Sequence, residues 1–123
     1  MTQTVRIINT TRGTVLADRG EVARSFLARG LGLMGRKELP DGYALVIYPE
    51  SSIHMLFMRV PIDVLFVDRE HRVISVRESL PPWHPFAGVA PWRGRYVVEL
   101  PAGVVRRTAT APGDTIEISP PLY

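Results

Sequence analysis

The chain contains no cysteine. A protein without cysteine cannot be a disulfide scaffold, cannot bind a metal through thiolates and cannot use a cysteine nucleophile. The absence leaves the compartment open, because a cysteine-free protein is stable in both reducing and oxidising surroundings.

Long hydrophobic runs are also absent. The longest apolar stretches, residues 43–48 and 64–67, are far shorter than the ~20 residues that a membrane helix needs. The amino terminus, residues 1–6, has neither the apolar region nor the cleavage site of an export signal. The sequence therefore predicts a cytoplasmic protein without a membrane partner.

The chain has little excess of positive over negative charge. The formal net charge is +3, from 15 Lys and Arg against 12 Asp and Glu, and the basic residues are scattered among acidic ones. Because nucleic-acid binding depends on many phosphate contacts, this distribution predicts no nucleic-acid partner.

Strand-forming segments dominate what is present. The length of 123 residues and the 46% hydrophobic content fit one domain, residues 1–123, with its own core. Two β-prone runs, residues 4–9 and 14–17, flank a short Gly-containing linker and predict a hairpin. Further strands are predicted at residues 43–48, 53–58, 62–67, 72–76, 96–100 and 114–119.

One helix is predicted near the N-terminus. Asp18 and Glu21 resemble a capping pair at the start of a helix over residues 21–29, and Gly30 is a typical C-terminal stop. Residues 102–107 predict a helical turn at most. The expected fold is mostly β, a small α+β domain: an antiparallel β-barrel or sandwich with one α-helix near the N-terminus.

The segment 80–95 contains four prolines and predicts a long irregular loop. Such a loop is uncommon in a small domain unless it serves a function. Trp83 and Trp92 lie on it and are expected to cover a pocket or to dock a protein partner.

Asp63 interrupts a strand that is apolar on both faces. A buried carboxylate needs a cationic partner or several amide donors. The structural interpretation is an ion pair or a capped turn. The functional interpretation is a pocket carboxylate with a perturbed pKa, and the structural one is favoured because ion-pair networks perturb pKa values as readily.

His54 is predicted on a strand, on the same face as Leu56 and Met58. A lone histidine on an apolar face is more often a core or rim residue than a ligand. His71 and His84 are too far along the chain to complete an evident ligand set, so no metal and no cofactor are expected.

Three glycines and two arginines, Arg29 and Arg36, lie in residues 29–36. The backbone amides and guanidinium groups of such a turn suit a carboxylate or phosphate. The alternative is a tight turn that inserts Leu31, Leu33 and Met34 into the core. The spacing matches no nucleotide-binding motif.

The leading functional hypothesis is a non-catalytic binding or accessory domain with a small pocket for an anionic or polar ligand. It requires Arg36 and Asp63 to lie on the same side of the core. The predicted pocket residues are Arg29, Arg36, His54, Asp63, Glu99 and Trp83.

Two alternatives stay open. One is an enzyme for a small polar or carbohydrate-like substrate, with Asp63 or Glu99 as acid or base and His54 assisting. No Gly-x-Ser-x-Gly elbow supports a serine nucleophile. The other is a module that docks a protein partner through the Pro-Trp loop.

Three sequence blocks stand out together: Arg29-x-x-Gly32-Leu33-Met34-x-Arg36, residues 53–68, and Val98-Glu99-Leu100-x-Ala102-Gly103 followed by Gly113-Asp114. In their order and spacing they resemble the domain of unknown function 192 family, also called uncharacterised protein family 0127. Ala28 departs from the glutamate of many relatives, and Phe57-Met58-Arg59 departs from their aromatic-Met-Lys-Asn. The resemblance implies a compact, mostly antiparallel β fold with one helix, and no particular reaction.

Overall fold

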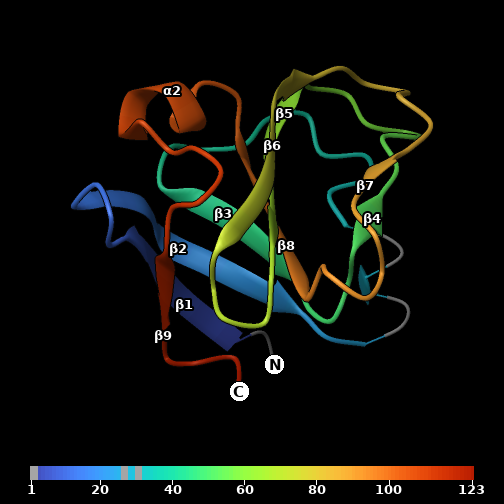
Figure 1. Cartoon of the computed structure of the whole chain (residues 1–123). Helices are drawn as coiled ribbons and strands as arrows, with labels where there is room; N and C mark the ends of the chain where they lie inside the picture. Colours follow the sequence, from blue (N-terminus) through green and yellow to red (C-terminus); the bar gives the residue numbers. More distant parts are fainter. Residues whose placement is uncertain (1–2, 26–27, 30–31) are drawn as a thin grey trace.

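A computed structural model describes residues 3–25, 28–29 and 32–123 (Figure 1). Its elements are β1 (Gln3–Asn9), β2 (Thr14–Ala23), β3 (Tyr43–Ile47), β4 (Ser52–Ile53), β5 (Ile62–Val67), β6 (Val73–Leu80), β7 (Ala87–Gly88), β8 (Tyr96–Pro101), α2 (Val104–Thr108) and β9 (Ile116–Ser119).

Seven strands form one sheet in the order β6-β5-β8-β3-β2-β1-β9, and β4 pairs with β7 in a second, two-stranded sheet. The hairpin of β1 and β2 is confirmed, with Asn9 opposite Thr14. The prediction of a purely antiparallel sheet is wrong for one pair of strands. β2 and β3 are parallel, because residues 24–42 carry the chain back before β3 begins.

The large sheet curls into a half-barrel whose two edges meet at one end. The β9 end of the sheet reaches the β6 end through an antiparallel bridge between Arg72 and Thr115, and the Ile116 amide donates to the His71 carbonyl at 2.9 Å. In Figure 1, α2 lies at one end of this half-barrel, and its Val104 and Val105 join the core inside the curl.

Two hydrophobic clusters cover the two faces of the central strands. Inside the curl lie side chains such as Val46, Leu65 and Val98. Their strand neighbours point the other way, into an outer cluster beneath the β4–β7 layer. Residues 62–67 are buried on both faces, as the apolar sequence predicts.

The predicted helix at residues 21–29 is wrong at its start, since Glu21 to Ala23 continue β2. They pair with β1 on one side and β3 on the other, and hydrogen bonding at both edges outweighs a local capping signal. Ala28 and Arg29 are helical, while Phe26, Leu27, Gly30 and Leu31 lie outside the described residues. The short helix α2 lies near the C-terminus, where the sequence predicts only a turn.

Two other segments differ from expectation. Of the strand predicted at residues 53–58, only Ile53 is in β4, and His54 begins an irregular segment. The loop at residues 80–95 contains β7, whose Ala87 pairs with Ile53 of β4. The pairing partner lies over thirty residues away, so the local proline pattern could not reveal it.

A buried polar network joins the end of β1 to the segment before β9. The Asn9 amide group donates to Thr110 Oγ1 at 3.1 Å and to Asp114 Oδ2 at 3.0 Å, and Arg12 Nε lies 3.1 Å from the same carboxylate oxygen. Burial acts to raise the pKa of Asp114, but the hydrogen bonds from Asn9 and Arg12 outweigh it and hold that pKa below its ordinary value.

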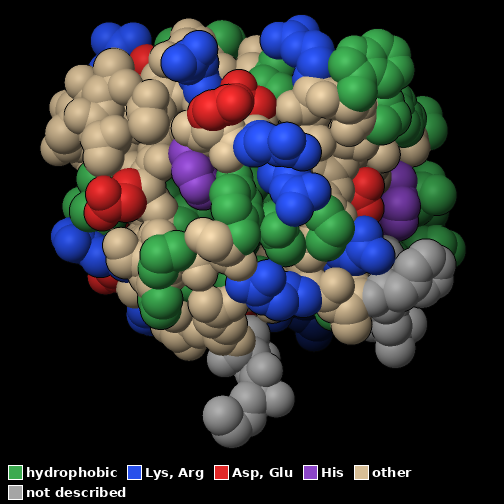
Figure 2. Space-filling view, turned by 60° about the horizontal axis from the view of Figure 1, so that its bottom comes forward, with side chains coloured by type: hydrophobic (Ala, Val, Ile, Leu, Met, Phe, Trp, Pro, Cys, Tyr) green, Lys and Arg blue, Asp and Glu red, His purple; other side chains and the backbone are tan. Residues whose placement is uncertain are grey.

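No helix in the described part of the chain is long and apolar enough to cross a membrane. Figure 2 shows one face of the surface, on which basic side chains lie among hydrophobic and acidic ones.

Candidate functional site

Glu99 is the unusual residue of the outer cluster. It lies on β8 opposite Leu45 of β3 and Val64 of β5, so its side chain points with theirs away from the inside of the curl. It is 3% exposed, and its Oε1 atom has no hydrogen-bond partner. Burial raises the pKa of Glu99 to about 8, so the carboxyl is mostly protonated at neutral pH.

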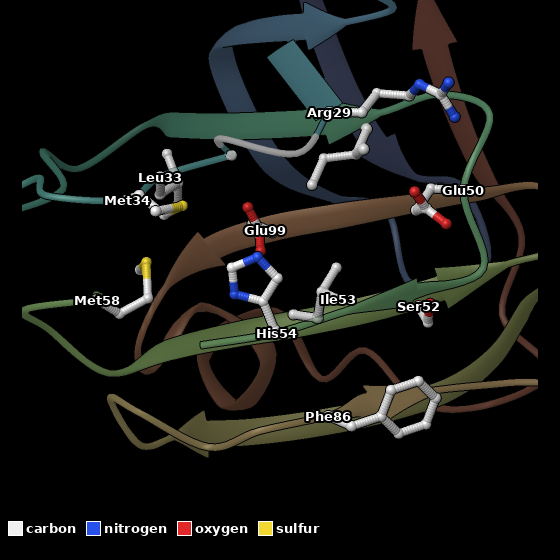
Figure 3. Close-up of a pocket in the computed structure, with 12 residues that line it drawn as sticks. Arg29, Leu33, Met34, Glu50, Ser52, Ile53, His54, Met58, Phe86 and Glu99 are labelled. Carbon is white, nitrogen blue, oxygen red and sulfur yellow. The ribbon is translucent and has the colours of Figure 1, made fainter. Parts of the chain in front are cut away.

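A cavity of about 240 Å³ lies beside this carboxyl (Figure 3). Its walls come from β3, β4 and β8, from the segment after β2 and from the loop between β6 and β8. Half of the lining residues have hydrophobic side chains, and five others have polar or charged side chains. The lining residues are Arg29, Gly32, Leu33, Met34, Ile47, Glu50, Ser52, Ile53, His54, Met58, Phe86 and Glu99.

Gly32 brings the backbone close to the carboxyl. Its φ is +50°, in the left-handed region that favours glycine, and a Cβ atom at this position would lie 3.5 Å from Glu99 Oε1. The Gly32 amide donates to the Ala28 carbonyl at 3.0 Å, which fixes the turn. The glycine of the Gly-Leu-Met segment therefore leaves space at the floor of the cavity.

Arg29 lies at one end of the cavity. Its Nη1 atom donates to the Pro49 carbonyl at 2.8 Å, while its buried Nε has no partner. No carboxylate among the described residues lies within 4 Å of it. The positive charge of Arg29 is therefore not paired with a carboxylate among the described residues.

His54 follows β4 and faces the middle of the cavity, near Glu99 in Figure 3. Its Nδ1 atom accepts a hydrogen bond from the Leu56 amide at 3.1 Å. A neutral imidazole that accepts at Nδ1 carries its proton on Nε2. His54 and protonated Glu99 both act as donors, so the middle of the cavity favours a ligand with acceptor atoms.

The structure does not bring Arg36 and Asp63 together, as the predicted pocket requires. The Arg36 guanidinium lies 4.9 Å from the Tyr43 ring centroid and 3.9 Å from Glu21, in a hollow next to the cavity. Tyr43 belongs to the outer cluster, whereas Asp63 lies on the inner face of β5. The predicted pocket is therefore divided between two sides of the sheet.

Asp63 is held by backbone amides, which is one of the two arrangements expected for a buried carboxylate at this position. Its Oδ1 accepts from Ser79 at 2.8 Å, and its Oδ2 accepts from Gly103 at 3.0 Å and Val105 at 2.9 Å. These bonds join the start of α2 to β5 and β6. Three amide donors satisfy the buried carboxylate, which fits the structural interpretation of this residue.

The two tryptophans of the long loop do not line the cavity. Trp83 is 57% exposed and its ring lies 4.9 Å from that of Phe57, whereas Trp92 is 86% exposed and borders a separate hollow with Asp68. The loop reaches the cavity through Phe86, which is 63% exposed. Of the predicted pocket residues, Arg29, His54 and Glu99 line this cavity.

Glu50, Ser52 and Phe86 line the cavity but are missed by the sequence analysis. Nothing in the sequence around them resembles a motif. Their place depends on the pairing of β4 with β7, which joins distant segments. Within the described residues, no group of three or more His, Cys, Asp or Glu side chains is placed to hold a metal ion.

Two solved structures are similar in fold. One, a protein of unknown function from Novosphingobium aromaticivorans, has a TM-score of 0.80 and 27% identity, covering 94% of this chain and 84% of that one. The other is described as a putative transcription regulator from Sinorhizobium meliloti. Its TM-score is 0.81 at 26% identity, with 97% and 95% of the two chains covered.

Proteins with similar sequences include the UPF0127 proteins of Pyrococcus horikoshii and Thermococcus sibiricus. The first is 37% identical over 117 residues, covering 90% of this chain and 96% of its own, and the second is 35% identical, covering 90% and 73%. The profile of the DUF192 family, "Uncharacterized ACR, COG1430", matches residues 7–118. The chain therefore belongs to the DUF192 family, which confirms the resemblance seen in its three sequence blocks.

Proposed function

We propose that the protein is a non-catalytic binding domain that holds one small polar ligand in the cavity between Arg29, His54 and Glu99. The observation that carries this proposal is the Glu99 carboxyl, which is buried beside an open space with no partner for Oε1. Burying a polar group without a hydrogen bond costs free energy. A ligand that accepts from the protonated carboxyl would recover part of that cost.

The size and lining of the cavity agree with this proposal. A volume of about 240 Å³ accommodates a metabolite, not a large cofactor. Apolar walls with a few convergent polar groups are the usual lining of small-molecule sites. The polar groups are mainly donors, which favours a ligand rich in acceptor oxygens.

A thermal-shift screen with small carboxylic acids, amino acids and sugars tests the proposal. A ligand that binds only the folded protein, at 100 times its Kd, adds about 2.7 kcal/mol of stability, roughly a 10 °C shift for a domain of this size. The screen is run on the parent, on Glu99→Gln and on Glu99→Leu.

Glutamine keeps a donor at this position, whereas leucine fills the same space without one. We expect a ligand that shifts the parent and Glu99→Gln but not Glu99→Leu. The leucine variant should fold at least as stably as the parent, because it removes an unsatisfied buried group. Arg77→Ala, which removes an exposed arginine on β6, is the control. Equal shifts in all four proteins would disprove a site at Glu99.

The enzyme alternative is favoured by one observation, the raised pKa of Glu99 beside a cavity, which is typical of a general acid. Asp63, the other carboxyl proposed for it, lies on the opposite face of the sheet. A ligand found in the screen can then be used as a test substrate to distinguish a binding domain from an enzyme. Proton NMR of that ligand with the protein shows product over hours only if the protein is an enzyme.

A further inference from the structure

Two opposite charges lie at the same end of the cavity. Arg29 donates from Nη1 to the carbonyl of Pro49, the residue directly before Glu50, and the side chains of Arg29 and Glu50 both line the cavity. Figure 3 shows the two groups together at the end away from Met34 and Met58. Yet they form no ion pair within 4 Å.

Each of these charged side chains makes one hydrogen bond to the backbone. Glu50 Oε1 accepts from the Ser51 amide at 3.1 Å, and no described residue donates to its Oε2. On Arg29, the bond to Pro49 uses Nη1, and Nε, which is closed to solvent, has no described partner. The charge of the guanidinium group, which lines the cavity, suits a carboxylate.

A cation and an anion that line the same end of a cavity without pairing suit a ligand that carries both charges. A simple carboxylate would satisfy Arg29 but would approach Glu50 with a charge of the same sign. An amine would have the reverse conflict at Arg29. An α-amino acid has its carboxylate and its ammonium group on one carbon, so it complements both.

The rest of the cavity fits the side chain of such a ligand. Away from the charged end, the walls are formed by apolar groups such as Leu33, Ile53 and Met58. His54 and Glu99 project between these walls and the charged end, as Figure 3 shows. The lining thus combines a charged end for the zwitterion with an apolar part that contains two hydrogen-bond donors.

We infer that the ligand is a free α-amino acid, with its carboxylate on Arg29, its ammonium group on Glu50 and its side chain toward Glu99. This inference rests on the proposed function, since it names the ligand class of the same cavity. It adds that both charges of the ligand are required.

Isothermal titration calorimetry at pH 6.5 with the standard L-amino acids tests this inference. Each amino acid that binds is compared with its 2-hydroxy acid, which lacks the ammonium group, and with its amide, which lacks the carboxylate. We expect each analogue to bind at least about ten times more weakly. Glu50→Gln, which keeps an acceptor for the Ser51 amide, should bind the amino acid and the hydroxy acid with similar affinity. Arg29→Gln should weaken both, and Glu117→Gln on β9 is the control for loss of a carboxylate.

The outcomes separate the inference from the proposed function. If the hydroxy acid binds the parent as tightly as the amino acid, the inference is wrong and the cavity takes simple carboxylates. If only sugars or other neutral molecules bind, and binding depends on Glu99, the inference fails while the proposed function stands. If no compound in either screen binds in a way that depends on Glu99, both are overturned.

Discussion

Replacing Glu99 with glutamine should stabilise the protein, by an amount that grows with pH. Burial raises the pKa of Glu99 from 4.5 to about 8 in the folded chain. Below about pH 4.5 the carboxyl is protonated in both states, so its ionisation does not affect folding. Between pH 4.5 and about 8 the unfolded chain releases this proton while the folded chain keeps it, so the free energy of unfolding falls as pH rises.

The slope in that window is about 1.4 kcal/mol for each pH unit. The loss amounts to about 3 kcal/mol at pH 7 and approaches about 5 kcal/mol above pH 8. Glutamine has nearly the same shape and no proton to release, so Glu99→Gln lacks this dependence.

Urea denaturation at pH 5, 6, 7 and 8 measures the effect, with Glu117→Gln as the control for an exposed glutamate. The stability of Glu99→Gln relative to the parent should rise by about 1 kcal/mol for each pH unit on average, because the slope falls below its full value near pH 5 and pH 8. A difference that stays constant from pH 5 to pH 8 would refute the assignment of a protonated, buried Glu99.

Three further predictions concern other parts of the fold. Asp63→Ala leaves three backbone amides, one buried and two partly buried, without their acceptor and should lower the free energy of unfolding by about 3 kcal/mol in urea denaturation. Asp114→Asn should cost about 1–3 kcal/mol at pH 7, with a deficit that narrows as pH falls to 2, because the lowered pKa of Asp114 contributes stability only above its folded value. Gly32→Ala should cost about 1 kcal/mol through strain at positive φ, and should weaken ligand binding about tenfold by filling the space beside Glu99.

Each of these predictions has a result that contradicts it. An Asp63→Ala protein as stable as the exposed-site variant Asp41→Ala would show that the three amide bonds do not matter. If the loss of unfolding free energy in Asp114→Asn stays the same at low pH, then ionisation of Asp114 does not stabilise the fold. Unchanged binding by Gly32→Ala would place the ligand away from the cavity floor.

The sequence predicts the central strands well, because their signal is local. Residues 62–67 are apolar on both faces and therefore predict a strand buried on both sides, which the structure confirms. The capping pattern at Asp18 fails because Glu21 to Ala23 gain two hydrogen-bonding neighbours, β1 and β3, which are separated in sequence. Local propensity is a weak guide where a segment pairs on both edges.

The candidate site was predicted in part for a similar reason. Arg29, His54 and Glu99 stand out as polar residues in apolar or glycine-rich surroundings, and all three line the cavity. Glu50 and Phe86 have no such contrast with their neighbours, and only the β4–β7 pairing brings their segments together. Successive side chains of a strand point to opposite faces of the sheet, so the register of β5 decides on which face Asp63 lies.

Two of the buried carboxyls, Asp63 and Glu99, show how structural and functional roles differ in physical terms. Asp63 accepts three backbone amide hydrogen bonds, so removing it would destabilise the fold and its presence needs no further explanation. Glu99 is equally buried, but Oε1 has no partner and its pKa is raised to about 8, so at neutral pH it lowers stability. A leucine or glutamine would serve the fold better at that position. This cost falls at the edge of a cavity that Arg29 and His54 also line, which supports the proposed ligand-binding function.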